Sequence, residues 1–397
     1  MKTQWRSHKE SQRVRCAALV TAGFSLLGAV PTSTAASQFA PAVNYAVGTN
    51  PNSVAVGDFN HDGIPDLATA EELNSGKTVS VLLGNGDGTF RPAVKYAAGA
   101  GATSVAVGDF NRDGNLDLVT ANANTANVSV LLGNGDGTFQ PPVDYGAGSD
   151  PEVVAVGDFN LDGNLDLVTA NFNDADVSVL LGNGNGTFQK AVDYSAGGHP
   201  AWVTVADFNH DGRPDLAVGN RQKVAILLGN GDGTFQAAQF YTAGSVPKSI
   251  AVGDFNNDGN LDIAVQNVSS NNVSILLGNG DGTFRPPVNY AVGSAPAAIV
   301  TADFNGDHKL DLATVNRLSN NVSVLLGNGD GAFGPATNYA VGSRPLALTA
   351  ADLDGDGGPD IVAANTVTNN VSVLLNTEAA HNVRFASRDG GMILPQF

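Results

Sequence analysis

The sequence predicts an all-β protein that folds as a closed seven-bladed β-propeller, and three observations support this. First, an acidic motif recurs seven times at steps of 51, 49, 49, 47, 49 and 49 residues; it reads Asp, a large apolar residue, Asn or Asp, any residue, Asp, usually Gly, two more residues and Asp. Second, the repeats show strand-like alternation and turn residues without a helical pattern, and a period near 50 without helices is typical of propellers. The third observation is the arrangement of the chain ends.

The last repeat lacks a segment that the chain supplies at its beginning. Six repeats contain Leu-Leu-Gly-Asn-Gly-x-Gly-x-Phe, whereas the seventh stops at Asn376 without it. Residues 38–48 match the segment that comes after this turn in the other repeats, with Phe39 and Tyr45 at the same spacing as their counterparts. We therefore expect the N-terminal strand to complete the last blade, which closes the ring and leaves no open sheet edge.

Each repeat contains four predicted strands. In the second repeat, alternation and turn chemistry place them at Ser104–Gly108, Leu116–Ala121, Asn127–Leu132 and Pro141–Tyr145. Asn-Gly and Asp-Gly pairs at 133–137 favour a tight hairpin between the third and outer strands, because both pairs accept positive φ angles. All seven tyrosines and most phenylalanines keep fixed positions in the repeat, so we expect them to pack between blades rather than bind a ligand.

We expect three segments: a signal peptide at 1–36, the propeller at 37–376 and a flexible tail at 377–397. Five basic residues and one acid occupy residues 1–15, and an apolar run and a stretch of small residues follow. This order is typical of a secretory signal peptide. The alternative is an uncleaved membrane anchor, but the 15 apolar residues are fewer than the roughly 20 that span a bilayer. We expect a secreted protein, extracellular or periplasmic, with no membrane span in the mature chain.

The acidic motif has the composition of a calcium loop. In the first copy Asp58, Asn60 and Asp62 alternate, a glycine permits a sharp reversal, and Asp66 closes the loop at the start of the next strand. Their side-chain oxygens can converge with the Ile64 carbonyl on one hard cation. Calcium accepts six to eight oxygens in loose geometry, whereas magnesium needs a tighter octahedron and keeps its waters. The sequence therefore predicts Ca²⁺ as the occupant.

The charge balance agrees with metal loops. The formal net charge is −18, and the motifs hold three acids in each of six copies and four in the seventh, which is 22 of the 38 Asp and Glu residues. We assign the acidity to metal sites rather than to a basic partner, and we expect no nucleic acid partner. The single cysteine, Cys16, lies in the predicted signal peptide, so we expect no disulfide in the mature chain.

The repeated motif, with its period, resembles the FG-GAP or VCBS-type repeats of integrin α-subunit-like seven-bladed propellers, and the resemblance extends from about residue 38 to 376. In that family the first, third, fifth and ninth motif residues bind Ca²⁺ by side chain and the seventh by its carbonyl. The resemblance therefore implies up to seven calcium ions, one per blade. The implied ligands are Asp58, Asn60, Asp62, Ile64 and Asp66; Asp109, Asn111, Asp113, Asn115 and Asp117; Asp158, Asn160, Asp162, Asn164 and Asp166; Asp207, Asn209, Asp211, Arg213 and Asp215; Asp254, Asn256, Asp258, Asn260 and Asp262; Asp303, Asn305, Asp307, Lys309 and Asp311; and Asp352, Asp354, Asp356, Gly358 and Asp360.

Two copies depart from the common pattern. In the sixth, His308 replaces the usual glycine and Lys309 follows it. A residue with a Cβ is strained at a position that favours positive φ, so we expect this calcium site to be the weakest. The seventh copy carries an additional acid, Asp354, and we expect it to bind calcium most tightly.

The loops at the other end of the blades diverge among the repeats. The resemblance implies that this face, opposite the calcium loops, binds an unidentified protein or glycan. We expect a monomeric, non-catalytic module for adhesion or ligand recognition. The candidate residues of this face are Glu71, Glu72, Asp150, Glu152, Phe172, His199, Trp202, Arg221, Lys248, Arg317 and Arg344.

Two other functions stay open at this point. One is a carbohydrate-binding lectin with a single site near Trp202, and the other is a polysaccharide-active enzyme in which acids such as Glu72 and Glu152 pair across the ring. The sequence contains no nucleophile elbow, zinc-binding histidine pair or phosphate loop. We therefore expect that the protein is not an enzyme.

Overall fold

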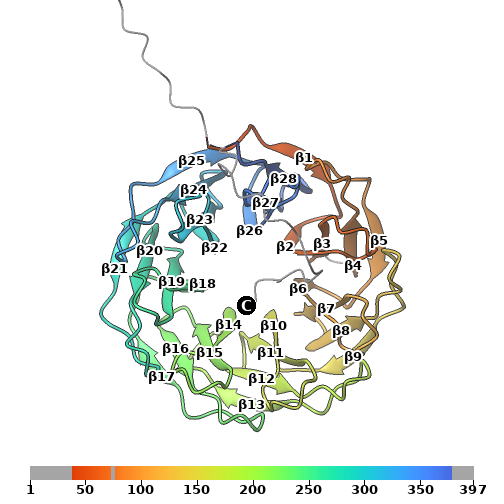
Figure 1. The fold of residues 1–397 in the computed structure, drawn as a ribbon. Helices are drawn as coiled ribbons and strands as arrows, with labels where there is room; N and C mark the ends of the chain where they lie inside the picture. Colours follow the sequence, from red (N-terminus) through yellow and green to blue (C-terminus); the bar gives the residue numbers. More distant parts are fainter. Residues whose placement is uncertain (1–37, 73–76, 378–397) are drawn as a thin grey trace, which may run out of the picture. The chain divides into compact units, whose positions relative to one another are not determined.

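Four-stranded antiparallel sheets repeat seven times around a ring in the computed structural model, as predicted (Figure 1). The structure describes residues 38–72 and 77–377, and these residues contain 28 strands and no helix. The signal peptide expected at 1–36 and all but the first residue of the tail expected at 377–397 lie outside the described residues. No described segment is a helix that is long and apolar enough to cross a membrane.

The blades follow one another along the chain, each running from the axis outwards. Their strands are β2 (Pro51–Gly57), β3 (Asp66–Glu71), β4 (Thr78–Leu82) and β5 (Val94–Ala97) in blade 1; β6 (Ala102–Gly108), β7 (Asp117–Asn122), β8 (Asn127–Leu131) and β9 (Val143–Gly146) in blade 2; β10 (Pro151–Gly157), β11 (Asp166–Asn171), β12 (Asp176–Leu180) and β13 (Val192–Ser195) in blade 3; β14 (Trp202–Ala206), β15 (Asp215–Gly219), β16 (Val224–Leu227) and β17 (Gln239–Tyr241) in blade 4; β18 (Pro247–Gly253), β19 (Asp262–Asn267), β20 (Asn272–Leu276) and β21 (Val288–Ala291) in blade 5; β22 (Pro296–Ala302), β23 (Asp311–Asn316), β24 (Asn321–Leu325) and β25 (Thr337–Ala340) in blade 6; and β26 (Pro345–Ala351), β27 (Asp360–Asn365), β28 (Asn370–Leu374) and β1 (Val43–Ala46) in blade 7.

The strands predicted for the second repeat all exist, with shifted ends. β6 begins two residues before the predicted Ser104, and its register with β7 shifts between Ala102 and Ser104. β9 begins at Val143 instead of Pro141, and β13 begins at the equivalent Val192.

The N-terminal strand closes the ring, as the offset repeat predicts. β1 pairs antiparallel with β28, with Val43 opposite Val373. The pairing continues beyond the strands, because Phe39 forms a bridge with Asn376 and the Thr377 N–H donates to the Gln38 carbonyl at 2.8 Å. The chain ends are thus joined within one sheet, and β1 covers what is otherwise an open edge of β28.

The aromatic series packs between adjacent blades, which confirms that prediction. Phe139, from the hairpin of blade 2, meets Phe59 and Tyr96 of blade 1 edge to face, with ring centroids 5.5 and 5.3 Å apart. The same arrangement recurs around the ring, and at the closure Phe39 takes the hairpin position against Phe304 and Tyr339. Edge-to-face pairs contribute about 0.5–1.5 kcal/mol beyond the burial of their area.

Candidate metal sites and the opposite face

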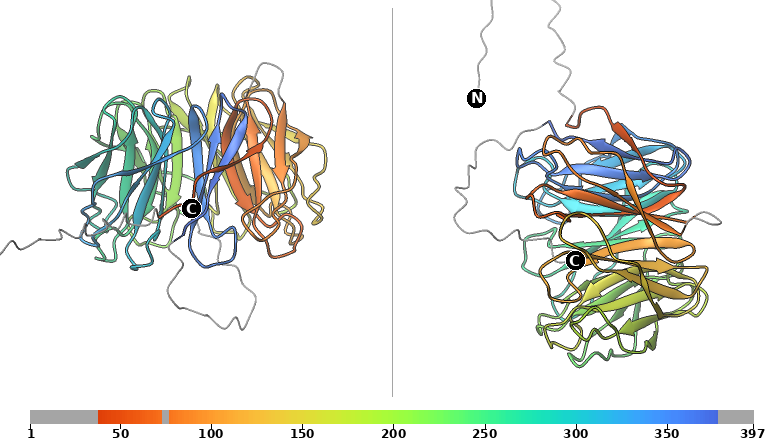
Figure 2. Two further views of the ribbon diagram at one scale, coloured as in Figure 1. Left: turned by 90° about the horizontal axis from the view of Figure 1, so that it is seen from above. Right: turned by 90° about the vertical axis from the view of Figure 1, so that its right-hand side faces the viewer.

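All seven acidic loops lie at the same end of the ring, since each joins the innermost strand of a blade to the second strand. The Gly-rich hairpins between third and outer strands share this end. The joins from second to third strand, and from outer strand to the next blade, lie at the other end, so the two sets of loops occupy opposite faces (Figure 2).

Inside each loop, backbone N–H groups hold the first, third and fifth side chains together. In the first copy the Asp62 N–H donates to Asp58 Oδ1 at 3.1 Å and to Asn60 Oδ1 at 3.0 Å. The Gly63 N–H donates to Asp58 Oδ2 at 2.9 Å, and the Ile64 N–H to Asp62 Oδ1 at 2.9 Å. The loop thus brings the oxygens of these three side chains together near the surface, in the position expected of calcium ligands.

Two turn positions of the loop take positive φ. The sixth residue does so in every copy, with φ +79° at Gly63 and +62° at His308. The expectation of a strained residue at His308 is therefore confirmed. The fourth residue is also left-handed in every copy, although five of the seven copies place a residue other than glycine there, such as Arg112 and Leu161.

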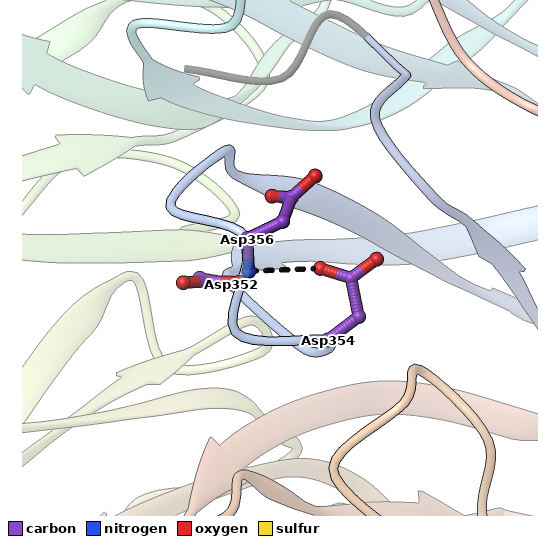
Figure 3. Close-up of side chains that lie close together, drawn as sticks. All are labelled: Asp352, Asp354 and Asp356. Atoms are coloured by element: carbon purple, nitrogen blue, oxygen red, sulfur yellow. Dashed lines mark hydrogen bonds between the residues drawn. The ribbon is translucent and has the colours of Figure 1, made fainter. Parts of the chain in front are cut away.

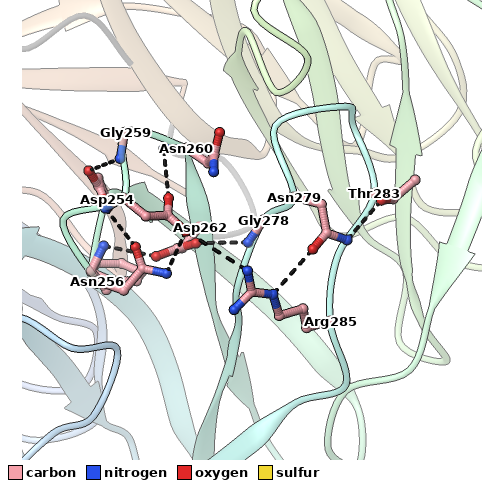
Figure 4. A network of polar contacts seen from close by, with 11 residues as sticks. Asp254, Asn256, Gly259, Asn260, Asp262, Gly278, Asn279, Thr283 and Arg285 are labelled. Carbon is pink, nitrogen blue, oxygen red and sulfur yellow. Dashed lines mark hydrogen bonds and ion pairs between the residues drawn. The ribbon is translucent and has the colours of Figure 1, made fainter.

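The ninth aspartate has different surroundings from the other three. Asp66 is fully buried; its Oδ2 accepts the Phe59 N–H at 2.9 Å, and its Oδ1 accepts the Gly84 N–H of the hairpin at 2.8 Å. Figure 4 shows the equivalent Asp262 bonded to the Gly278 N–H. Burial raises the pKa of Asp66 to about 6, against the opposing effect of these N–H groups. The ninth residue therefore fastens the acidic loop to the hairpin of its own blade.

The seventh copy brings three carboxylates together. Asp352, Asp354 and Asp356 each place an oxygen within 4.8 Å of the others, and no ion pair to any of them occurs among the described residues (Figure 3). Burial, together with the charges of Asp356 and Asp352, raises the pKa of Asp354. Clustered carboxylate oxygens without a cationic partner suit a hard divalent ion, so the residues present fit calcium.

Basic side chains contact the fifth aspartate in three other copies. Lys309 Nζ lies 3.0 Å from Asp307 Oδ2 in the sixth, and Arg213 Nη1 lies 3.5 Å from Asp211 Oδ2 in the fourth. In the fifth copy the cation is Arg285 of the hairpin, which Figure 4 labels. Its Nη2 lies 4.0 Å from Asp258 Oδ2. Sequence spacing could have indicated the first two contacts. The third depends on how the hairpin folds back over the loop.

Six overlapping matches to the FG-GAP-like repeat cover the ring, at residues 58–120, 109–169, 158–218, 207–265, 254–314 and 303–363. The chain belongs to the FG-GAP-like repeat family. No curated protein matches this FG-GAP propeller closely enough in sequence to count as a relative.

Solved structures share the fold of this FG-GAP propeller at low sequence identity. BBS1N, crystallised in complex with ARL6DN, is 12% identical with a TM-score of 0.62, and the match covers 86% of this chain and 97% of that one. A lectin from Agrocybe aegerita that recognises non-reducing terminal N-acetylglucosamine is 21% identical with a TM-score of 0.53, covering 82% and 91%. A putative 6-phosphogluconolactonase from Bacteroides fragilis is 16% identical with a TM-score of 0.60, covering 79% and 90%. These likenesses show the fold alone.

On the opposite face of the FG-GAP propeller, two predicted candidates serve the fold instead of the surface. Glu71 is buried and accepts the Gly48 N–H at 2.8 Å and the hydroxyls of Thr78 and Ser80. Trp202 packs in the cores on both sides of its blade, and its Nε1–H donates to Thr204 Oγ1 at 2.9 Å. The sequence could not indicate either role, because both depend on neighbouring strands.

The other polar candidates of this face are partly engaged with one another. Glu152 pairs across the ring with Lys248 at 3.6 Å, and Glu72 accepts the side-chain amides of Asn50 and Asn52. Each of the two acids considered for a glycosidase, Glu72 and Glu152, thus contacts another side chain. Phe172, His199 and Arg221 form one stack, in which the histidine ring lies 4.7 Å and the guanidinium carbon 4.5 Å from the phenyl centroid.

Proposed function

We propose that this FG-GAP propeller is an exported, calcium-stabilised recognition module without catalytic activity. The observation that carries the proposal is the contrast between the two faces of one ring. One face repeats the same acidic loop seven times, and the other places different side chains at equivalent positions in each blade. Repetition suits a stabilising metal in each blade, whereas divergence suits a single asymmetric ligand site.

Calcium would be held at each loop by the first, third, fifth and ninth side chains and the seventh carbonyl, and the ninth aspartate also fastens the loop to its hairpin. The ion supplies positive charge that offsets the repulsion among carboxylates such as Asp352, Asp354 and Asp356. The fourth, fifth and sixth loops already hold a basic side chain near the fifth aspartate. We therefore propose that calcium affinity is lower in these three loops than in the first and the seventh.

Recognition by the opposite face is consistent with the range of ligands among similar folds. One similar propeller was crystallised with a protein and another recognises a sugar, so the fold accommodates both. Enzymes also occur on this fold, including a putative lactonase. In this chain the two acids considered for catalysis, Glu72 and Glu152, are engaged by amides and by Lys248. These contacts favour binding over catalysis.

The calcium part of the proposal is tested by calorimetric melting of chelator-stripped protein, with and without added Ca²⁺ and with bound metal counted by elemental analysis. Each occupied site should add about 2.7 kcal/mol of stability when free ion is 100 times its dissociation constant. A large rise in melting temperature with four to seven ions per chain would support the proposal. A protein that binds no ion and melts unchanged would exclude it.

A further inference from the structure

Charge on the face opposite the acidic loops is divided between two halves of the ring. We define this face as the loops at that end and the two adjoining residues of each strand. Its described acids all lie in blades 1–3, whereas the part of blades 4–7 that the structure describes has no acid on this face, although the whole chain carries −18. The acids are Glu71, Glu72, Asp150, Glu152, Asp174 and Asp176, and the cations of blades 4–7 are Arg221, Lys223, Lys248, Arg317 and Arg344.

Four residues lie on adjoining loops of blades 6 and 7, and we call them the blade 6–7 patch: Arg317, Leu318, Arg344 and Val367. Backbone contacts join the loops that carry them. The Arg344 N–H donates to Asn320 Oδ1 at 2.8 Å in the loop of Arg317 and Leu318. The Arg344 carbonyl accepts the N–H of the residue before Val367 at 3.1 Å. The patch is therefore held by both blades.

The patch combines unpaired positive charge with exposed aliphatic surface. Leu318 is 68% exposed and Val367 is 59% exposed, the two highest values among the large hydrophobic residues that the structure describes. The guanidinium groups of Arg317 and Arg344 have no ion pair or hydrogen bond within residues 38–72 and 77–377. By contrast, Lys248 is paired with Glu152, so it contributes less to a charged ligand site.

The turns themselves do not require these side chains. At the position of Leu318 and Val367, the equivalent turns of blades 2, 3 and 5 carry Asn124, Asn173 and Ser269. Polar residues therefore fit this turn, and an exposed leucine gains nothing from folding because its side chain stays in water. Among the turns that the structure describes, an aliphatic residue at this position occurs in blades 6 and 7, which also carry the unpaired arginines. This coincidence indicates a surface that is covered in a complex.

We propose that the blade 6–7 patch binds an acidic segment of a partner protein. Carboxylates of the segment pair with Arg317 and Arg344, and its aliphatic side chains cover Leu318 and Val367. The combination favours a polypeptide over an acidic glycan, because a glycan offers carboxylates without alkyl side chains to bury. The acids of blades 1–3 repel the same segment, which confines it to one half of the face. This inference rests on the proposed function and specifies its ligand.

The test is selection of a phage-displayed random peptide library on the calcium-loaded full chain at low salt. A parallel selection uses the quadruple variant Arg317→Thr, Leu318→Ser, Arg344→Asn and Val367→Ser. Each substitution introduces a residue type that an equivalent loop of another blade already contains, such as Ser269. We therefore expect the variant to have the melting temperature of the parent. The matched control is Ala123→Thr with Asn124→Ser, which alters the same turn of blade 2.

We expect enrichment of peptides that combine Asp or Glu with Leu, Ile or Val. Fluorescence anisotropy should show binding at least about tenfold weaker to the quadruple variant, unchanged binding to the blade 2 control, and loss of affinity as salt rises. Alginate, a polyanion without alkyl side chains, should compete poorly. Any one of four results would overturn the inference. They are selection of peptides without acids, equal binding to the quadruple variant, effective competition by alginate, and no enrichment of any peptide. A peptide that binds the blade 1–3 half of the face would overturn this inference but retain the proposed function, which fails separately if calcium does not bind.

Discussion

The fifth and ninth aspartates of each acidic loop differ in their surroundings, although the repeat has the same residue type at both positions. In the second copy Asp113 lies near the surface, and the Asn115 N–H bonded to it holds its pKa below the usual range. Asp117 is fully buried, and burial raises its pKa to about 6. One motif therefore contains a residue placed to meet an ion and a residue placed to hold the fold.

Alanine substitutions should separate these two roles. Asp113→Ala should lower stability mainly in the presence of Ca²⁺, by about 2.7 kcal/mol when free ion is 100 times its dissociation constant. Asp117→Ala leaves the buried Phe110 and Gly133 N–H groups without an acceptor, and each such group costs about 1–3 kcal/mol. Urea unfolding with and without chelator measures both effects. A loss for Asp117→Ala that disappears in chelator would show that its role is confined to metal binding.

Restoring the common pattern in the sixth copy should create a stronger calcium site. His308→Gly removes a residue at φ +62°, and Lys309→Asn frees Asp307 from the lysine ammonium 3.0 Å away. We expect the double variant to bind one more calcium ion per chain, as counted by titration calorimetry. Asp307→Ala in the parent should cost less than Asp113→Ala, because the parent loop binds calcium weakly.

The reverse change in the second copy provides the matched control. Gly114→His with Asn115→Lys gives that loop the residues of the sixth copy, so it should lose one bound ion. If both double variants bind the parental number of ions, the lysine contact and the strained turn do not govern affinity.

The sequence predicts contacts that repeat with the period and misses those that break it. The fold, the closing strand and the interblade aromatics follow from positions shared by all copies. The cation near Asp258 comes from Arg285, 27 positions further on in a hairpin, and the repeat gives no sign of that contact. The sequence predicts Glu71 on the surface, whereas the structure shows that it accepts two hydroxyls from β4. Such contacts depend on the local surroundings of single side chains and not on the shared pattern, since Arg91 has the position of Arg285 in blade 1 but forms no ion pair among the described residues.

At the level of the blade, a line of polar side chains crosses the three outer strands. In blade 2 the Asn122 Nδ2 donates to Ser129 Oγ at 2.9 Å, and this hydroxyl donates to Asp144 Oδ1 at 2.6 Å. Blade 1 reverses the chemistry, with the acceptor Glu71 on the second strand and Lys95 opposite Ser80 on the outer strand. The acceptor of this polar line can therefore lie on the second strand or on the outer strand, provided that the residue on the other strand changes as well.

Removal of the central hydroxyl should weaken the blade. Ser129→Ala takes away the acceptor of Asn122 Nδ2 and the donor to Asp144, so we expect a loss of about 1–3 kcal/mol. Ser149→Ala, in a loop whose serine hydroxyl has no described partner, should change stability by less than about 0.5 kcal/mol. Urea unfolding of both variants checks this difference, and equal effects would show that the polar line adds nothing to stability.

At the level of the whole molecule, the ring depends on a strand from the opposite end of the chain. Deletion of residues 38–46 removes β1 and leaves the edge of β28 open, so we expect a lower melting temperature and oligomers that form by edge pairing. A synthetic peptide of residues 38–46 added in trans should restore the monomer, as judged by analytical ultracentrifugation. A truncated chain that stays monomeric and melts like the parent would contradict a role for this strand in stability.

The closing strand also sets the order in which this molecule can be made. Each of blades 1–6 is a local meander that can form soon after its own residues leave the ribosome, since its strands are neighbours in sequence. The bond from Ser372 to Asn44 joins residues 328 positions apart, so the ring stays open until β28 has been synthesised. Long-range pairing of this kind is slow compared with local pairing. β1 therefore stays unpaired while the chain from β2 to β28 is synthesised.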